Sequence, residues 1–112
     1  MTNIVDSNFN RRHKDRIKTT LNAQYFIKKQ SSQYLECKVV DLSRTGAVVS
    51  VSINEKLQRG TIMFIDIYIP KTLLHVSVQA EIKRVERHEK EIIGGVKFTE
   101  LISEPMFEQL TR

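Results

Sequence analysis

Residues 74–87, LHVSVQAEIKRVER, alternate apolar and polar side chains over a longer stretch than any other part of the sequence. Period-two alternation predicts a half-buried β-strand, because successive side chains of a strand point to opposite faces of a sheet. One face of this strand is apolar and carries Val76, Val78, Ala80 and Ile82. The other face is polar and carries His75, Ser77, Gln79, Glu81 and Lys83. Such a strand needs partner strands with which it can bury its apolar face.

The same alternation recurs on both sides of this segment. It predicts further strands over residues 18–28, 35–41, 47–53, 61–69 and 91–99, separated by polar turns such as residues 29–32. Residues 103–112 predict a short helix instead, since Ser103 is a suitable N-cap and Pro105 falls in the first turn. The expected fold is all-β, a six-stranded antiparallel β-barrel with a short C-terminal α-helix. A two-sheet sandwich is the alternative.

Composition limits the class of protein. The chain has 112 residues, 40% of them apolar, which suits one domain with one core. Its 18 Lys and Arg against 13 Asp and Glu give a formal net charge of +5, which favours anionic partners. The single cysteine, Cys37, excludes an intrachain disulfide and indicates a reducing compartment. No secretion signal or membrane-spanning stretch is present, so we expect a cytoplasmic protein without membrane insertion.

No arrangement of residues predicts catalysis. The histidines are far apart and no pair has the spacing of metal ligands: they are His13, His75 and His88. Cys37 falls on the apolar face of a predicted strand, which favours an inert core thiol. Gly94 and Gly95 do not precede a helix, so a strand bulge is a better interpretation than a phosphate-binding loop. We expect no enzymatic activity, no metal and no cofactor.

A basic segment precedes the first predicted strand. Residues 11–16, RRHKDR, contain Arg11, Arg12 and Arg16. The guanidinium fork of arginine pairs bidentately with phosphate and also matches the O6/N7 edge of guanine. Taken alone, the segment is most simply interpreted as a solvated basic arm.

A second polar segment follows the second predicted strand. Residues 41–46, DLSRTG, suit a tight turn in which Asp41 and Ser43 cap backbone amides. The same side chains can offer polar groups to the edge of a ligand, while Gly46 lets that ligand approach the backbone.

Together, the two segments resemble the signature of the PilZ domain family. An Arg-x-x-x-Arg pair before the first strand is followed, after the second strand, by [Asp/Asn]-x-Ser-x-x-Gly. Every fixed position is present: Arg12, Arg16, Asp41, Ser43 and Gly46. The resemblance covers roughly residues 10–112 and extends to residues 95–98, GVKF, which look like the family's late Gly-x-x-Phe strand.

The resemblance implies a barrel that binds the bacterial second messenger cyclic di-GMP. By family role, Arg12 and Arg16 contact phosphates and guanine edges. Asp41 and Ser43 bind a guanine from the barrel face, and Gly46 clears space for it. Arg11 stands just before the motif, where the family's arginine accompanies a stacked, intercalated pair of ligand molecules.

The resemblance also implies a division of the chain and a mode of action. Residues 1–17 are expected to form a flexible N-terminal arm that folds over the ligand, and residues 18–112 the PilZ-like barrel with its C-terminal helix. The protein would change conformation on binding cyclic di-GMP and signal to a separate, unidentified downstream protein.

Two other interpretations remain open. One is a PilZ-like module that binds protein without nucleotide, although the intact motifs argue against it. The other is a small basic barrel for single-stranded nucleic acid, which requires aromatic side chains exposed on a strand face. Tyr34 and Tyr68 are candidates, but neither lies in a basic cluster, and most of the five Phe and three Tyr are expected inside. We therefore expect no nucleic acid polymer as a partner.

Overall fold

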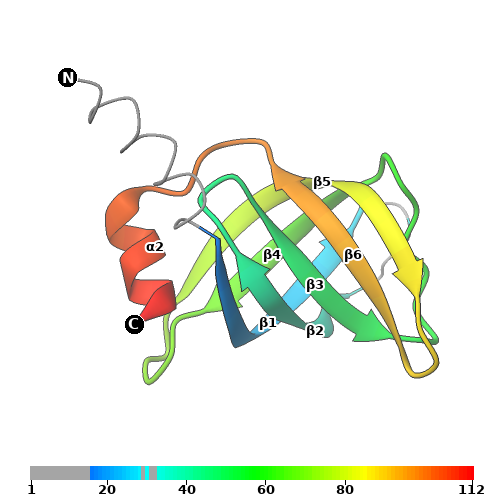
Figure 1. Ribbon diagram of the computed structural model, residues 1–112, viewed down its shortest axis with the longest axis horizontal. Helices are drawn as coiled ribbons and strands as arrows, with labels where there is room; N and C mark the ends of the chain where they lie inside the picture. The colour runs from blue at the N-terminus through cyan, green and yellow to red at the C-terminus, as the bar shows by residue number, and fades with distance from the viewer. Residues whose placement is uncertain (1–15, 29, 31–32) are drawn as a thin grey trace, which may run out of the picture.

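Six antiparallel strands form a closed barrel, and a short helix lies at one end of it (Figure 1). The computed structural model describes residues 16–28, 30 and 33–112. Its elements are β1 (Ile17–Ile27), β2 (Leu35–Leu42), β3 (Gly46–Ser52), β4 (Ile62–Tyr68), β5 (His75–Arg87), β6 (Glu91–Phe98) and α2 (Glu104–Thr111). The fold predicted from the sequence is confirmed, with each boundary within one residue of the expected one. Residues 1–15 of the arm expected over residues 1–17 lie outside the described residues. So do residues 29, 31 and 32 of the predicted turn at residues 29–32.

The strand order around the barrel is β1-β2-β3-β6-β5-β4. Closure comes from β1, which pairs with β2 along one edge and with β4 along the other. The sandwich alternative is therefore wrong. Because β3 pairs with β6 rather than with β4, the turn after β2 lies beside the end of β6. That arrangement brings the two halves of the candidate site together.

The apolar face of every strand points into the barrel, as the alternation predicts. The interior includes Tyr25, Val39, Val49, Ile65 and Ile82, each almost inaccessible to solvent. Leu57, from the connection between β3 and β4, is buried against this core, and so are Ile102 and Leu110 beside and within α2. Helix α2 begins as expected, with the Ser103 hydroxyl accepting a hydrogen bond from the Met106 backbone N–H at 3.4 Å.

Among the described residues, the core includes the ionisable side chains of Cys37 and Tyr25. Cys37 is buried, and desolvation raises the pKa of its thiol to about 12. Burial also raises the pKa of the Tyr25 phenol, and the nearby Glu55 carboxylate, which accepts its hydrogen bond at 3.3 Å, raises it further. The inert thiol predicted for Cys37 agrees with this environment, because the nucleophilic form of cysteine is the thiolate.

The β-bulges in β2 and β5 change which way the later side chains of those strands point. In β2, Val39 pairs with Val49 and Asp41 with Val48, so Val40 is an extra residue. In β5, Ile82 pairs with Val96 and Arg84 with Gly95, so Lys83 is an extra residue. The sequence predicted a bulge at Gly94 and Gly95 on β6. This prediction is wrong in its position, because the extra residue is Lys83 on the facing strand, β5.

The expectation that most aromatic side chains lie inside the barrel is wrong. In the described part of the chain only Tyr25 and Phe98 are buried. Phe26 and Phe64 pair across β1 and β4 on the outer face, where both are half-buried. The exposed Tyr34 ring lies 5.6 Å from that of Phe26, so the three rings form one outer row. The interior is filled mainly by branched aliphatic side chains instead.

Candidate ligand-binding pocket

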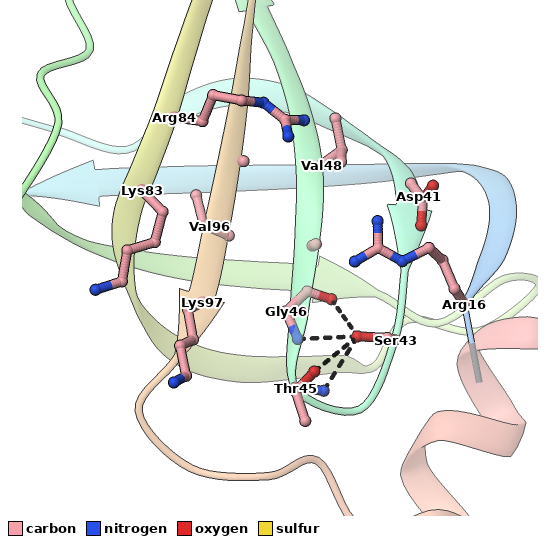
Figure 2. Close-up of a pocket in the computed structure, with 12 residues that line it drawn as sticks. Arg16, Asp41, Ser43, Thr45, Gly46, Val48, Lys83, Arg84, Val96 and Lys97 are labelled. Carbon is pink, nitrogen blue, oxygen red and sulfur yellow. Dashed lines mark hydrogen bonds between the residues drawn. The ribbon is translucent and has the colours of Figure 1, made fainter. Parts of the chain in front are cut away.

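A pocket of about 250 Å³ lies on the outside of the barrel, between the β2–β3 turn and the β5–β6 pair (Figure 2). Four of the six predicted site residues line it: Arg16, Asp41, Ser43 and Gly46. Arg11 and Arg12, the remaining two, lie outside the described residues. Arg16 immediately precedes β1, and the other lining residues come from the β2–β3 region, β5 and β6, so four separate parts of the chain meet at this pocket.

The bulge in β2 places Asp41 on the outer surface. Leu35, Cys37 and Val39 point inward at odd positions, and an unbroken strand would turn position 41 inward as well. The extra residue at Val40 reverses the alternation of inward and outward side chains, so Leu42 is fully buried and Asp41 faces the pocket. Figure 2 shows its carboxylate beside the Arg16 side chain.

Ser43 holds the turn that follows. Its hydroxyl oxygen accepts hydrogen bonds from the backbone N–H groups of Thr45 at 3.2 Å and of Gly46 at 3.1 Å (Figure 2). The backbone closes the same turn, because the Ser43 N–H donates to the Gly46 carbonyl at 2.9 Å. The prediction that Ser43 caps backbone amides is confirmed. The same prediction for Asp41 is wrong, since its carboxylate accepts no hydrogen bond from any described residue.

Gly46 is required by the packing of two strands. It pairs with Lys97 on β6, and a β-carbon at position 46 would lie 2.4 Å from the Val96 carbonyl oxygen. Real β-carbons essentially never approach backbone atoms so closely. Glycine at this position therefore lets β3 and β6 pair at the edge of the pocket.

The turn is also fastened to the segment that leads into α2. The Arg44 side chain donates from Nε to the Ile102 carbonyl at 2.8 Å, and its Nη1 lies 3.5 Å from Oε1 of Glu104. The Ile102 N–H donates to the Arg44 carbonyl at 2.9 Å. One wall of the pocket is thus tied directly to the start of the helix.

Sequence reasoning missed the opposite wall, which carries three cations: Lys83, Arg84 and Lys97. The signal for two of them lies in residues 82–85, where apolar Ile82 and Val85 enclose two consecutive basic residues and so break the alternation. That break marks the bulge, and the bulge turns both basic side chains outward. Lys97 carries no comparable signal, because its proximity to the turn follows from the pairing of β3 with β6.

Charge in the pocket is strongly one-sided. The titratable groups among its lining residues are four cations and one carboxylate, Asp41. Lys83 and Arg84 have acidic partners on their own strand, Glu81 at 3.3 Å and Glu86 at 3.1 Å. The cationic excess favours an anionic ligand, and the Asp41 carboxylate can accept hydrogen bonds from a group such as the N1–H and N2–H₂ edge of guanine.

Other features of the described residues do not form a comparable site. A hollow of about 800 Å³ over β1, β2 and β3 is larger, but its charged residues have both signs: Glu36, Lys38, Lys90 and Glu91. No group of three or more potential metal ligands occurs among residues 16–28, 30 and 33–112. In the same part of the chain, no helix has the length and apolar character needed to span a bilayer.

The fold and the pocket define a small closed antiparallel barrel with a cationic external binding site. A family model described as the PilZ domain matches residues 10–112. The chain therefore belongs to the PilZ domain family. A search of curated protein sequences finds no match to it.

Solved structures with the same fold include other PilZ domains. The inhibitor of motility of Bacillus subtilis (MotI/DgrA) has a TM-score of 0.65 and 14% identity, and the match covers 86% of this chain but only 46% of the Bacillus protein. The PilZ domain of YcgR from Escherichia coli, solved with c-di-GMP, has a TM-score of 0.65 and 16% identity over 85% of this chain and 82% of that one. The PilZ domain of CeSA from a cellulose-synthesizing bacterium has a TM-score of 0.57 and 24% identity over 83% and 86%. At these identities the likeness concerns the fold.

Proposed function

We propose that this protein is a non-catalytic receptor for cyclic di-GMP, which it binds in the pocket between the β2–β3 turn and the β5–β6 pair. Arg11, Arg12 and Arg16 supply guanidinium groups to phosphates and guanine edges. Asp41 and Ser43 receive a guanine from the barrel surface. The protein changes conformation when the arm over residues 1–17 folds onto the ligand, and it signals to a separate partner protein in the cytoplasm.

One observation carries this proposal: Arg16, Asp41, Ser43 and Gly46, far apart in the sequence, line a single cationic pocket. The Asp41 carboxylate and the Arg16 guanidinium lie side by side there without forming an ion pair with each other. An acceptor and a cationic donor that do not neutralise each other remain available for a ligand that carries both donors and phosphates. Family membership and the c-di-GMP in the Escherichia coli PilZ structure add support.

The outer aromatic row raises the nucleic-acid interpretation again, since Tyr34, Phe26 and Phe64 could stack bases. Its surroundings oppose that interpretation. Gln24, the outward residue next to Phe26 along β1, pairs with Glu36 and with Asp66 on the neighbouring strands. On the other side of the row, Ile62 pairs with Glu81. The charged side chains near the rings have both signs, since Glu81 is paired with Lys83 and the exposed Lys28 follows β1. The row therefore lacks the basic surroundings that a phosphate backbone requires, and cyclic di-GMP remains the better-supported ligand.

Isothermal titration calorimetry tests the proposal. Purified protein is titrated with cyclic di-GMP, with GMP and with short single-stranded DNA in one buffer. We expect binding of cyclic di-GMP and much weaker or undetectable binding of the other two. DNA binding of equal or greater strength would favour the nucleic-acid interpretation, and binding of none of the three would favour a protein-interaction module.

A further inference from the structure

Arg84 has an unusual position for a residue of β5. The inward-pointing residues of this strand occupy even positions up to Ile82, so an unbroken strand would direct position 84 into the core. The extra residue at Lys83 turns Arg84 outward, opposite Gly95 on β6. Figure 2 shows its side chain running from β5 across β6 toward Val48 on β3.

Gly95 allows the guanidinium to lie low over β6. A β-carbon at position 95 would lie 3.5 Å from Cβ, Cζ and Nη2 of Arg84, so both the base and the tip of the arginine side chain pack over this glycine. A larger side chain at position 95 would occupy the space that the guanidinium now fills. The arginine therefore forms part of the pocket floor on the β5–β6 side.

A carboxylate fixes one end of this guanidinium. Nε of Arg84 lies 3.1 Å from Oε2 of Glu86, while the side chain as a whole keeps 60% of its surface exposed. The ion pair uses the Nε edge, and the exposed side chain still lines the pocket. Lys83 and Lys97, on the same wall, offer only point charges on flexible stems.

We propose that Arg84 is a base-stacking residue of the pocket, with its guanidinium plane over Gly95 contacting a purine ring of the ligand. This inference rests on the proposed function and adds a contact from the β5–β6 wall, outside both sequence motifs. A guanidinium plane stacks on purine rings in a way that an ammonium group does not. The pocket would then hold the ligand between the turn residues on one wall and Arg84 on the other.

Titration of wild type and two variants with cyclic di-GMP tests this role. Arg84→Lys keeps the charge and loses the plane, so we expect binding about tenfold weaker than wild type. Arg84→Tyr keeps a plane and loses the charge, so it should bind more tightly than Arg84→Lys. Arg87→Lys is the matched control, because Arg87 is exposed on the same strand and does not line the pocket. It should bind as wild type does, and all variants should keep the wild-type melting temperature.

The possible outcomes separate this inference from the proposed function. Absence of cyclic di-GMP binding by the wild type overturns both. If the wild type binds and Arg84→Lys binds equally well, the proposed function stands and the stacking role is overturned. Equal weakening in Arg84→Lys and Arg84→Tyr would mean that the guanidinium acts by hydrogen bonding, which also overturns the stacking role.

Discussion

Gly46 on β3 lies so close to Val96 on β6 that a β-carbon at position 46 would stand 2.4 Å from the Val96 carbonyl oxygen. The glycine of the second motif is thus required for strand pairing at the edge of the pocket, whatever occupies that pocket. Ser43 also has a structural role, because its hydroxyl accepts hydrogen bonds inside the turn. Two of the motif's three fixed residues therefore build the wall that carries the third, Asp41.

Gly46→Ala should destabilise the protein in the absence of ligand. The methyl group can be accommodated only if β3 and β6 move apart, and overpacking of this kind typically costs about 1–3 kcal/mol. Denaturant unfolding measures the loss. Gly95→Ala is the control, since its methyl group would meet Arg84 atoms at an ordinary 3.5 Å. Equal free energies of unfolding for the two variants would contradict the assigned role of Gly46.

Ser43→Ala and Asp41→Ala should separate turn stability from ligand binding. Removing the Ser43 hydroxyl leaves the Thr45 and Gly46 N–H groups without their side-chain acceptor, which should lower stability by about 1 kcal/mol and weaken cyclic di-GMP binding as well. Asp41→Ala should weaken binding and leave stability almost unchanged, because its carboxylate has no hydrogen-bond partner among the described residues. Thermal unfolding and calorimetry on both variants check this. A marked loss of stability in Asp41→Ala would show that this side chain also supports the turn.

Arg12→Ala and Arg16→Ala should weaken cyclic di-GMP binding by roughly ten- to a hundredfold, because each removes charge-assisted hydrogen bonds. Stability without ligand should barely change, since an exposed arginine contributes little to folding. Lys28→Ala removes an exposed charge of the same sign away from the pocket and should change neither quantity. Calorimetry on the three variants is the measurement. If all three had the same small effect on binding, the arginines would act only as part of a diffuse positive field.

Stability should fall in alkaline solution because buried acids keep their protons in the folded state. Burial raises the pKa of the Cys37 thiol from its ordinary 9.0 to about 12, so between these values the unfolded chain releases a proton that the folded chain retains. Each such group lowers stability by up to about 1.4 kcal/mol per pH unit as the pH rises. Tyr25 acts in the same direction from about pH 10.

Unfolding free energies of wild type and Cys37→Ala measured from pH 8 to 11 check this prediction. The variant loses packing at every pH, so the relevant quantity is the slope rather than the value. Between pH 9 and 10, before Tyr25 contributes, the wild-type slope should be the steeper. Parallel curves would show that the Cys37 thiol titrates alike in both states.

The strands of the barrel could be predicted from the sequence because the alternation of apolar and polar side chains is visible among neighbouring residues. The alternation around a residue such as Val78 or Ile65 is enough to predict which face of the strand it occupies. Closure is not local in this way: a two-sheet sandwich would bury the same apolar faces, and only the pairing of β1 with both β2 and β4 excludes it. The same local rule failed for the aromatic residues. Phe26 and Phe64 occupy outward positions of their strands, and only the pairing of β1 with β4 places the two residues opposite each other.

The candidate site was predictable only on one wall. Asp41, Ser43 and Gly46 are recognisable because they lie within one short segment, and Arg16 because of its spacing from Arg12. Arg84 and Lys97 reach the pocket through the order of strands around the barrel, which no local pattern encodes. The bulge at Lys83 did leave a signal in the broken alternation, but its effect on the pocket depends on the partner strand.

Arg44→Ala should loosen the connection between the pocket wall and α2 without affecting the ligand contacts. Arg44 does not line the pocket, and its Nε donates to the Ile102 carbonyl at 2.8 Å from a side chain that is only 22% exposed. Removing the guanidinium leaves that carbonyl without its side-chain donor, which should cost about 1–2 kcal/mol of stability. Amide hydrogen exchange should also accelerate in Glu104–Thr111 relative to β5. Arg112→Ala is the matched control, because its ion pair with Glu108 at 3.1 Å is exposed on both sides and should contribute little. Exchange in α2 that is equally fast in both variants would show that Arg44 does not fasten the helix to the turn.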